Sequence, residues 1–103
     1  ASPPGAVVFG ALADKDAGPM LDRVAPLSRH RVYVAPKGRV ATPPEALATR
    51  YPGEVAAGAA DALARARRAA GRGALVVVCG SLYLVGEARA HLLGIPADPP
   101  VAL

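Results

Sequence analysis

The chain has 103 residues, of which 52% are hydrophobic and only 4% are aromatic, and it carries a net charge of +4. A chain this apolar can bury a core of Ala, Val and Leu, which excludes intrinsic disorder and fits one domain. No apolar run is long enough to span a membrane and no signal peptide opens the sequence, so we expect a cytoplasmic protein without a membrane partner.

The positive charge raises the question of an anionic partner. Most of the twelve basic residues are arginines scattered along the sequence, and few aromatic side chains accompany them for base stacking. We therefore do not expect nucleic acid as a partner. The single cysteine, Cys79, lies inside an apolar run, where a free thiol is usually a small apolar filler in a reducing compartment.

The first predicted strand is the apolar run at residues 6–12. It leads into Asp14, Lys15 and Asp16, three charges that must lie at the rim of a sheet because they cannot remain in a core. Asp16 is a suitable N-cap for a helix over residues 17–25, which Pro26 would end.

The middle of the chain predicts a strand at residues 31–35, placed nearer an edge because Pro36 follows it. Thr42 and Glu45 have the spacing of a capping box, in which Glu45 reaches back to the Thr42 amide, and they would open a short helix through residue 49.

Residues 54–70 predict the longest helix. Asp61 and Arg65 have the spacing of an ion pair on its outer side. Its inward face would consist of Val55, Ala59, Ala62, Leu63, Ala66 and Ala70.

The apolar run at residues 76–80 predicts a strand buried on both faces, followed by a helix to about residue 93. This helix would face inward through Leu84, Val85, Ala88 and Leu92. Ser81 stands between strand and helix, where it is either a plain N-cap or part of a ligand site, since ligands of open α/β sheets bind at the carboxyl ends of the strands.

Three strands alternating with helices predict a three-layer, Rossmann-like α/β sandwich around a mostly parallel sheet. The ammonium of Lys15, the hydroxyl of Ser81 and free helix amides would together suit a carboxylate or a phosphate. Two isolated histidines, His30 and His91, predict no metal site, and neither a phosphate-binding glycine loop nor a nucleophile elbow is present.

Three blocks of the sequence then resemble a known family. They are Val8-Phe9-Gly10-Ala11 with Asp14-Lys15-Asp16, residues 36–39, and Val78-Cys79-Gly80-Ser81-Leu82-Tyr83-Leu84-Val85-Gly86-Glu87-Ala88-Arg89. Over residues 7–93 the chain resembles the carboxyl-terminal domain of bacterial folylpolyglutamate synthase/dihydrofolate synthase, in the Mur ligase superfamily. The family uses MgATP to phosphorylate a folate or pteroate carboxylate, and the amino group of glutamate attacks the acyl phosphate.

The resemblance implies roles for the rim residues. Lys15 and Ser81 would bind the carboxylates of glutamate, and further contributors would be Asp14, Asp16, Gly80, Leu82 and Tyr83. It implies no catalytic residue and no metal ligand in this chain. The partners would be glutamate, the folate or pteroate substrate and an upstream ATP-binding domain.

Two family features are missing from the sequence: the upstream P-loop domain, which mainly binds MgATP, and the Asp-Gly-Ala-His-Asn segment. We therefore expect residues 1–103 to form a single, partial domain that lacks its first strand and helix, is irregular at residues 1–5 and 95–103, and is inactive alone. One alternative is a stand-alone α/β module that binds an anionic metabolite or phosphate. A second is a basic domain that interacts with nucleic acid.

Overall fold

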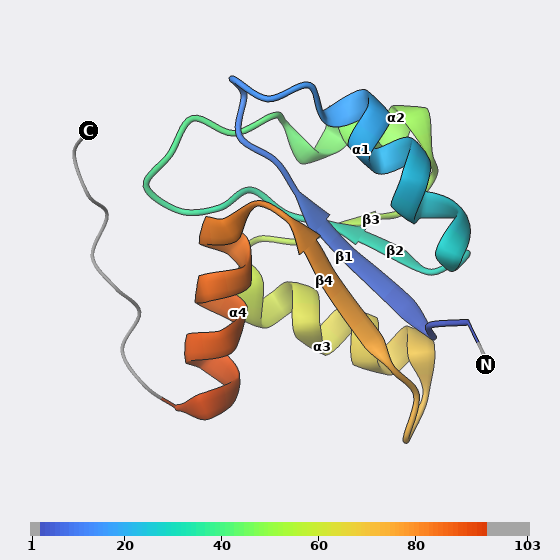
Figure 1. Ribbon diagram of the computed structural model, residues 1–103. Coiled ribbons are helices and arrows are strands. Elements are labelled where there is room, and N and C mark those ends of the chain that lie inside the picture. Colours follow the sequence, from blue (N-terminus) through green and yellow to red (C-terminus); the bar gives the residue numbers. More distant parts are fainter. Residues whose placement is uncertain (1–2, 95–103) are drawn as a thin grey trace.

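Four parallel strands form one sheet in the order β3-β2-β1-β4 in the computed structural model, which describes residues 3–94 (Figure 1). The strands are β1 (Ala6–Gly10), β2 (Arg31–Tyr33), β3 (Glu54–Val55) and β4 (Val76–Gly80). The helices are α1 (Ala17–Val24), α2 (Pro44–Arg50), α3 (Ala59–Ala70) and α4 (Leu82–Leu93). Helices α1 and α2 cover one face and α3 and α4 the other. The predicted three-layer α/β fold is confirmed.

The alternation of side chains along β1 divides the core into two halves. Val7 and Phe9 pack with Leu21 of α1 and Leu47 of α2 on one face. On the other face, Val8 packs with residues of β2, α3 and α4. All five residues of β1 are buried, because β1 has a strand on either side and helices on both faces.

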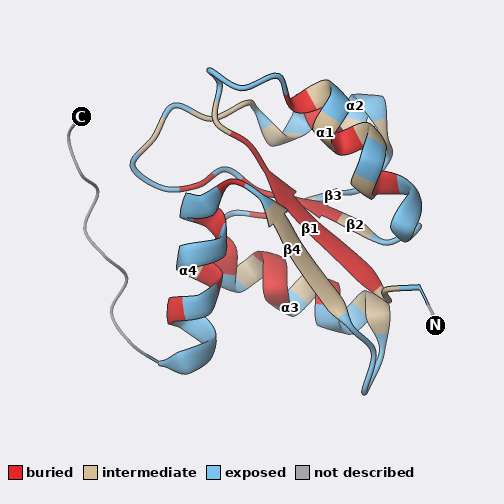
Figure 2. Cartoon of the chain, in the orientation of Figure 1, coloured by how far each residue is buried: buried red, intermediate tan, exposed pale blue. Residues whose placement is uncertain are grey.

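The positions of β2 and β4 in the sheet are the reverse of those predicted from the sequence. The strand predicted to be buried on both faces, β4, pairs only with β1 among the described residues, and its own residues are half-buried or exposed. Figure 2 shows this difference between β4 and the fully buried β1. The strand predicted nearer an edge, β2, lies between β1 and β3. Long-range pairing, which local composition does not encode, decides which strand is central.

The predicted helix over residues 54–70 is wrong at its start. Glu54 and Val55 form strand β3, paired with Val32 and Tyr33, and the helix begins at Ala59. Four of the other predicted inward residues are confirmed as buried, and Ala70 packs against the core. The buried ones are Ala59, Ala62, Leu63 and Ala66.

The predicted ion pair between Asp61 and Arg65 is confirmed, with Nε of Arg65 3.0 Å from Oδ2 of Asp61. The same carboxylate oxygen accepts the amide of Ala57. The Ala57 amide first, and then Arg65, lower the pKa of Asp61. Asp61 therefore connects the start of α3 to the segment that follows β3 through a hydrogen bond.

The predicted helix starts are only partly right. Asp16 precedes α1 as expected but makes no side-chain capping hydrogen bond. The capping box is wrong: the N-cap of α2 is Pro43, and the Thr42 hydroxyl instead donates to the carbonyl of Leu12. The helix α1 ends at Val24 and continues as a 3₁₀ turn, Ala25–Leu27.

The buried face of α4 differs from the predicted one, since it also includes Ala90. Leu84 and Ala88 are buried as expected, but Val85 is 38% and Leu92 is 51% exposed. The helix is apolar around most of its circumference, so the sequence holds no clear signal for its inward side. None of the helices within residues 3–94 combines the length and apolarity needed to cross a membrane.

A charged cluster joins α1 to α2. Arg50 donates from Nε and Nη2 to the two carboxylate oxygens of Asp22, at 2.8 and 2.6 Å, and the Tyr51 hydroxyl donates to Oδ1 at 2.8 Å. These donors, Arg50 first, lower the pKa of Asp22 to about 2. The cluster holds α1 and α2 together. Each of these helices follows a loop at the carboxyl edge of the sheet.

Because the folded-state pKa of Asp22 lies below the ordinary value of 3.8, ionised Asp22 stabilises the fold above about pH 4, and this stabilisation is lost as the pH falls towards 2. We expect the urea midpoint of the Asp22→Asn variant to fall less over this range than that of the parent chain. Asp14→Asn is the control, since Asp14 makes no ion pair among residues 3–94 and should keep the full decrease. Equal decreases in all three proteins would contradict a role for the cluster.

Candidate functional site

The two segments that carry the predicted site residues follow neighbouring strands. Strands β1 and β4 pair in parallel from Ala6 with Val76 to Gly10 with Gly80, so they end level with one another. Beyond β1 the chain continues to Lys15, and Ser81 comes directly after β4. The topology thus brings both segments to the carboxyl edge of the sheet, the edge where open α/β sheets bind ligands.

Two glycines permit the close packing of the backbone at this edge. Gly80 has a φ of +103°, and a Cβ there would lie 2.2 Å from the carbonyl oxygen of Gly10. A Cβ on Gly10 would lie 2.2 Å from the carbonyl oxygen of Val34. Glycine at position 80 therefore permits the turn from β4 into α4, and glycine at position 10 permits the close approach of β1 to the backbone of Val34.

Ser81 is the N-cap of α4, as one of its two predicted roles required. Its Oγ accepts the amides of Tyr83 at 3.1 Å and Leu84 at 3.5 Å, and the residue is only 6% exposed. These bonds use the hydroxyl as an acceptor, and a hydroxyl also carries one donor. Capping of α4 is thus a structural role of Ser81. If Ser81 also binds a ligand, it does so by donating its hydroxyl proton.

Lys15 lies in the exposed loop between β1 and α1. Its amide donates to the carbonyl of Leu12 at 3.1 Å, which closes a turn. Within residues 3–94 its ammonium makes no hydrogen bond and no ion pair, although Asp14 and Asp16 flank it. Lys15 is therefore a cation available to a ligand.

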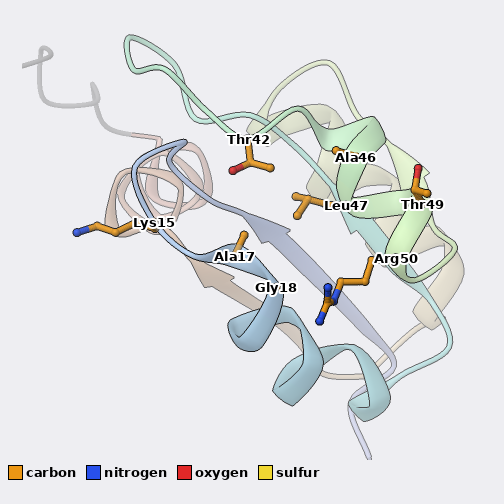
Figure 3. Close-up of a pocket in the computed structure, with 8 residues that line it drawn as sticks. All are labelled: Lys15, Ala17, Gly18, Thr42, Ala46, Leu47, Thr49 and Arg50. Carbon is orange, nitrogen blue, oxygen red and sulfur yellow. The ribbon is translucent and has the colours of Figure 1, made fainter.

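A groove of about 500 Å³ lies between α1 and α2 (Figure 3). Its lining consists of Lys15, Ala17, Gly18, Thr42, Ala46, Leu47, Thr49 and Arg50. Arg50 is neutralised by Asp22, and the side chain of Lys15 extends away from the other lining residues. Ser81 does not line the groove, so the groove does not unite the two predicted residues.

Sequence reasoning missed the part played by the loop between β2 and α2. The Lys37 amide donates to Oε2 of Glu87 at 3.1 Å, and the guanidinium of Arg39 lies over the ring of Tyr83, 4.1 Å from its centre. Both contacts join this loop to the first half of α4. They link residues more than forty positions apart, which no local pattern in the sequence could indicate.

The other predicted rim residues differ in their exposure and in their contacts. Leu82, the first residue of α4, is 87% exposed, whereas Tyr83 is covered on one side by Arg39. Cys79 is partly buried, its Sγ lies 3.9 Å from the carbonyl oxygen of Val8, and burial raises the pKa of its thiol. This thiol is a packing group, as the sequence suggested.

The carboxyl edge combines an ammonium, a guanidinium, the capped start of a helix and two exposed carboxylates. Cations at a helix amino terminus favour anionic groups, and neighbouring carboxylates favour an ammonium group. Within residues 3–94 no three His, Cys, Asp or Glu side chains are grouped as a metal site would require. The edge therefore carries charged groups of both signs. No protein-family model, curated protein or solved structure matches the chain.

Proposed function

We propose that the chain is the carboxyl-terminal, glutamate-binding domain of an ATP-dependent folate:glutamate ligase of the folylpolyglutamate synthase/dihydrofolate synthase family. The observation that carries this proposal is the level ending of β1 and β4. It brings two of the three sequence blocks that carry the family resemblance, one with Lys15 and one with Ser81, to the same edge of the sheet. The Rossmann-like fold agrees with the family but does not identify it, because one such fold serves many functions.

In this proposal the chain binds and orients the incoming amino acid. MgATP would bind mainly on an upstream domain and supply the phosphoryl group that activates the folate or pteroate carboxylate. Lys15 and the start of α4 would hold the carboxylates of glutamate, so that its amino group points towards the acyl phosphate. Holding the nucleophile in this orientation lowers the entropic part of the barrier.

The free edge of β4 supports the idea of a partial domain. Within residues 3–94, β4 pairs on one side only, and it contains no charged residue. Natural proteins usually protect such an apolar edge with charges, proline or a covering segment. A further strand of the complete enzyme would fit beside β4, which agrees with the missing first strand that the resemblance implies.

Glutamate titration of the ¹⁵N-labelled chain tests the proposal. We expect amide shifts confined to residues 14–16 and 80–84, and their loss in Lys15→Ala with the rest of the spectrum unchanged. Lys37→Ala is the matched control, because it also removes one exposed lysine but leaves the backbone amide that binds Glu87. A response in Lys15→Ala equal to that of the parent chain would remove Lys15 from the site.

A second candidate is a stand-alone module that binds an anionic metabolite or phosphate in the groove between α1 and α2, whose lining includes Lys15 and Arg50. In that case, titrations of the ¹⁵N-labelled chain with inorganic phosphate and with glutamate would give a different pattern of amide shifts. Inorganic phosphate would shift residues that line the groove, among them Ala17, Gly18, Ala46 and Thr49, and glutamate would have no effect at residues 80–84.

A further inference from the structure

We propose that the amino edge of the sheet, where the strands begin, is a docking surface for an acidic segment of another protein that also carries apolar side chains. Arginines of this edge would bind the carboxylates of the segment, and two exposed leucines would contact its apolar side chains. The surface lies at the opposite edge from the proposed glutamate site, so the inference goes beyond the proposed function and does not depend on it.

Backbone contacts bring the loops before β2 and β4 to either side of the start of β1. The Gly5 amide, just before β1, donates to the carbonyl of Leu75 at 2.8 Å. The carbonyl of Gly5 accepts the hydroxyl of Ser28, in the loop before β2, at 3.1 Å. Since neighbouring strands lie about 5 Å apart, these two loops border one continuous edge.

The ends of α1 and α3 reach the same edge from the two faces of the sheet. A Cβ on Gly5 would lie 2.7 Å from the Cβ of Ala70, the last residue of α3. Nε of Arg31, at the start of β2, donates to the carbonyl of Ala25, directly after α1, at 3.3 Å. The edge is therefore formed by two helix ends and the loops between them.

Exposed arginines without an ion pair are concentrated on these four segments. Within residues 3–94 they are Arg23, Arg29, Arg67, Arg68 and Arg72. The carboxylates of the described residues are either paired with an arginine or located on segments that follow the carboxyl ends of the strands. The paired ones are Asp22, Glu54 and Asp61, and the others are Asp14, Asp16, Glu45 and Glu87. The amino edge thus has an excess of positive charge.

The helix ends account for only some of these arginines. A cation in the last turn of a helix is favoured by the helix dipole, which explains the arginines of α1 and α3. Arg29 and Arg72 lie outside the helices. Arg72 stands between Gly71 and Gly73, both with positive φ and with open space around them, on a turn that projects from the sheet (Figure 1). Its guanidinium is therefore accessible to a partner.

Two exposed leucines add an apolar component to the same edge and favour a protein segment over a nucleic acid. Leu75 is 65% exposed and Leu27, which directly precedes Ser28, is 42% exposed. A nucleic acid offers phosphates but no aliphatic side chains, so it would leave both leucines in water. An acidic segment with apolar side chains matches both features, because arginine clusters recognise acidic motifs through the fork of the guanidinium.

Affinities of the full chain for two labelled synthetic peptides test the proposal. The first peptide consists of glutamate and leucine, and the second has serine in place of each leucine. We expect tighter binding of the first, and Arg29→Ala and Arg72→Ala should each weaken it about tenfold, the usual effect of losing a charge-assisted pair. Leu75→Ser should reduce the preference for the first peptide. Lys37→Ala is the matched control, since it removes an exposed cation from the opposite edge and should leave the affinity unchanged.

Three results would overturn the proposal. One is that the chain binds neither peptide. Another is that Lys37→Ala weakens binding as much as the two arginine variants do, because the attraction would then be a general one between opposite charges. The third is tighter binding of duplex DNA than of the glutamate–leucine peptide, with a steep dependence on salt, which would assign the edge to nucleic acid. If Leu75→Ser fails to fold, the two arginine variants and the two peptides still decide.

Discussion

Replacing Gly80 by alanine is expected to destabilise the chain by about 3–5 kcal/mol, a large part of the 5–15 kcal/mol that holds a typical domain folded. Two costs add at this position. The φ of +103° is one that residues with a Cβ rarely adopt, and the new Cβ would lie 2.2 Å from the carbonyl oxygen of Gly10. The backbone of β1 or β4 would have to move, and the strands are paired at this position.

Urea unfolding followed by circular dichroism measures this effect, and two other glycines provide controls. Gly10→Ala meets an equally close carbonyl, that of Val34, without a positive φ, so it isolates the steric cost. Gly86 lies within α4 with open space around it, and Gly86→Ala should stabilise the chain by about 0.5–1 kcal/mol. If Gly80→Ala unfolds at the same urea concentration as the parent chain, the described turn from β4 into α4 is wrong.

The sequence predicted the segments of the fold that have strong local signals. The apolar runs that became β1 and β4 are short, uniform and closed by small residues, so each was placed within about two residues of its observed end. The position of Ser81 between such a run and a helix allows two roles, an N-cap or part of a ligand site, and the observed bonds from the amides of Tyr83 and Leu84 confirm the first. The common edge of the two segments follows from parallel pairing alone.

Features that depend on contacts between distant residues could not be predicted in the same way. β3 has only two residues, and the spacing of Val55 also fits a helical face, so pairing with β2 decides its conformation. The edge position of β4 is likewise set by what lies beside it. The same holds at the candidate site, where Arg39 gains its neighbour Tyr83 from another element of the fold.

Replacing Ser81 by aspartate is expected to abolish the glutamate response while the fold is retained. Aspartate is as good an N-cap as serine, and its carboxylate is favoured near a helix amino terminus. It can therefore accept the amides of Tyr83 and Leu84, as Oγ of Ser81 does. The added negative charge would lie where the proposal places a carboxylate of glutamate, and the two anions repel.

Asparagine at this position is the matched control, because Ser81→Asn also retains the cap but adds no charge. We expect glutamate to bind Ser81→Asn within a few-fold of the parent chain and to produce no shifts with Ser81→Asp. Ser81→Ala, which removes the acceptor for two amides, should instead cost about 1 kcal/mol of stability. An unchanged glutamate response in Ser81→Asp would mean that Ser81 acts only as the cap of α4. The site would then comprise the loop after β1 without the start of α4.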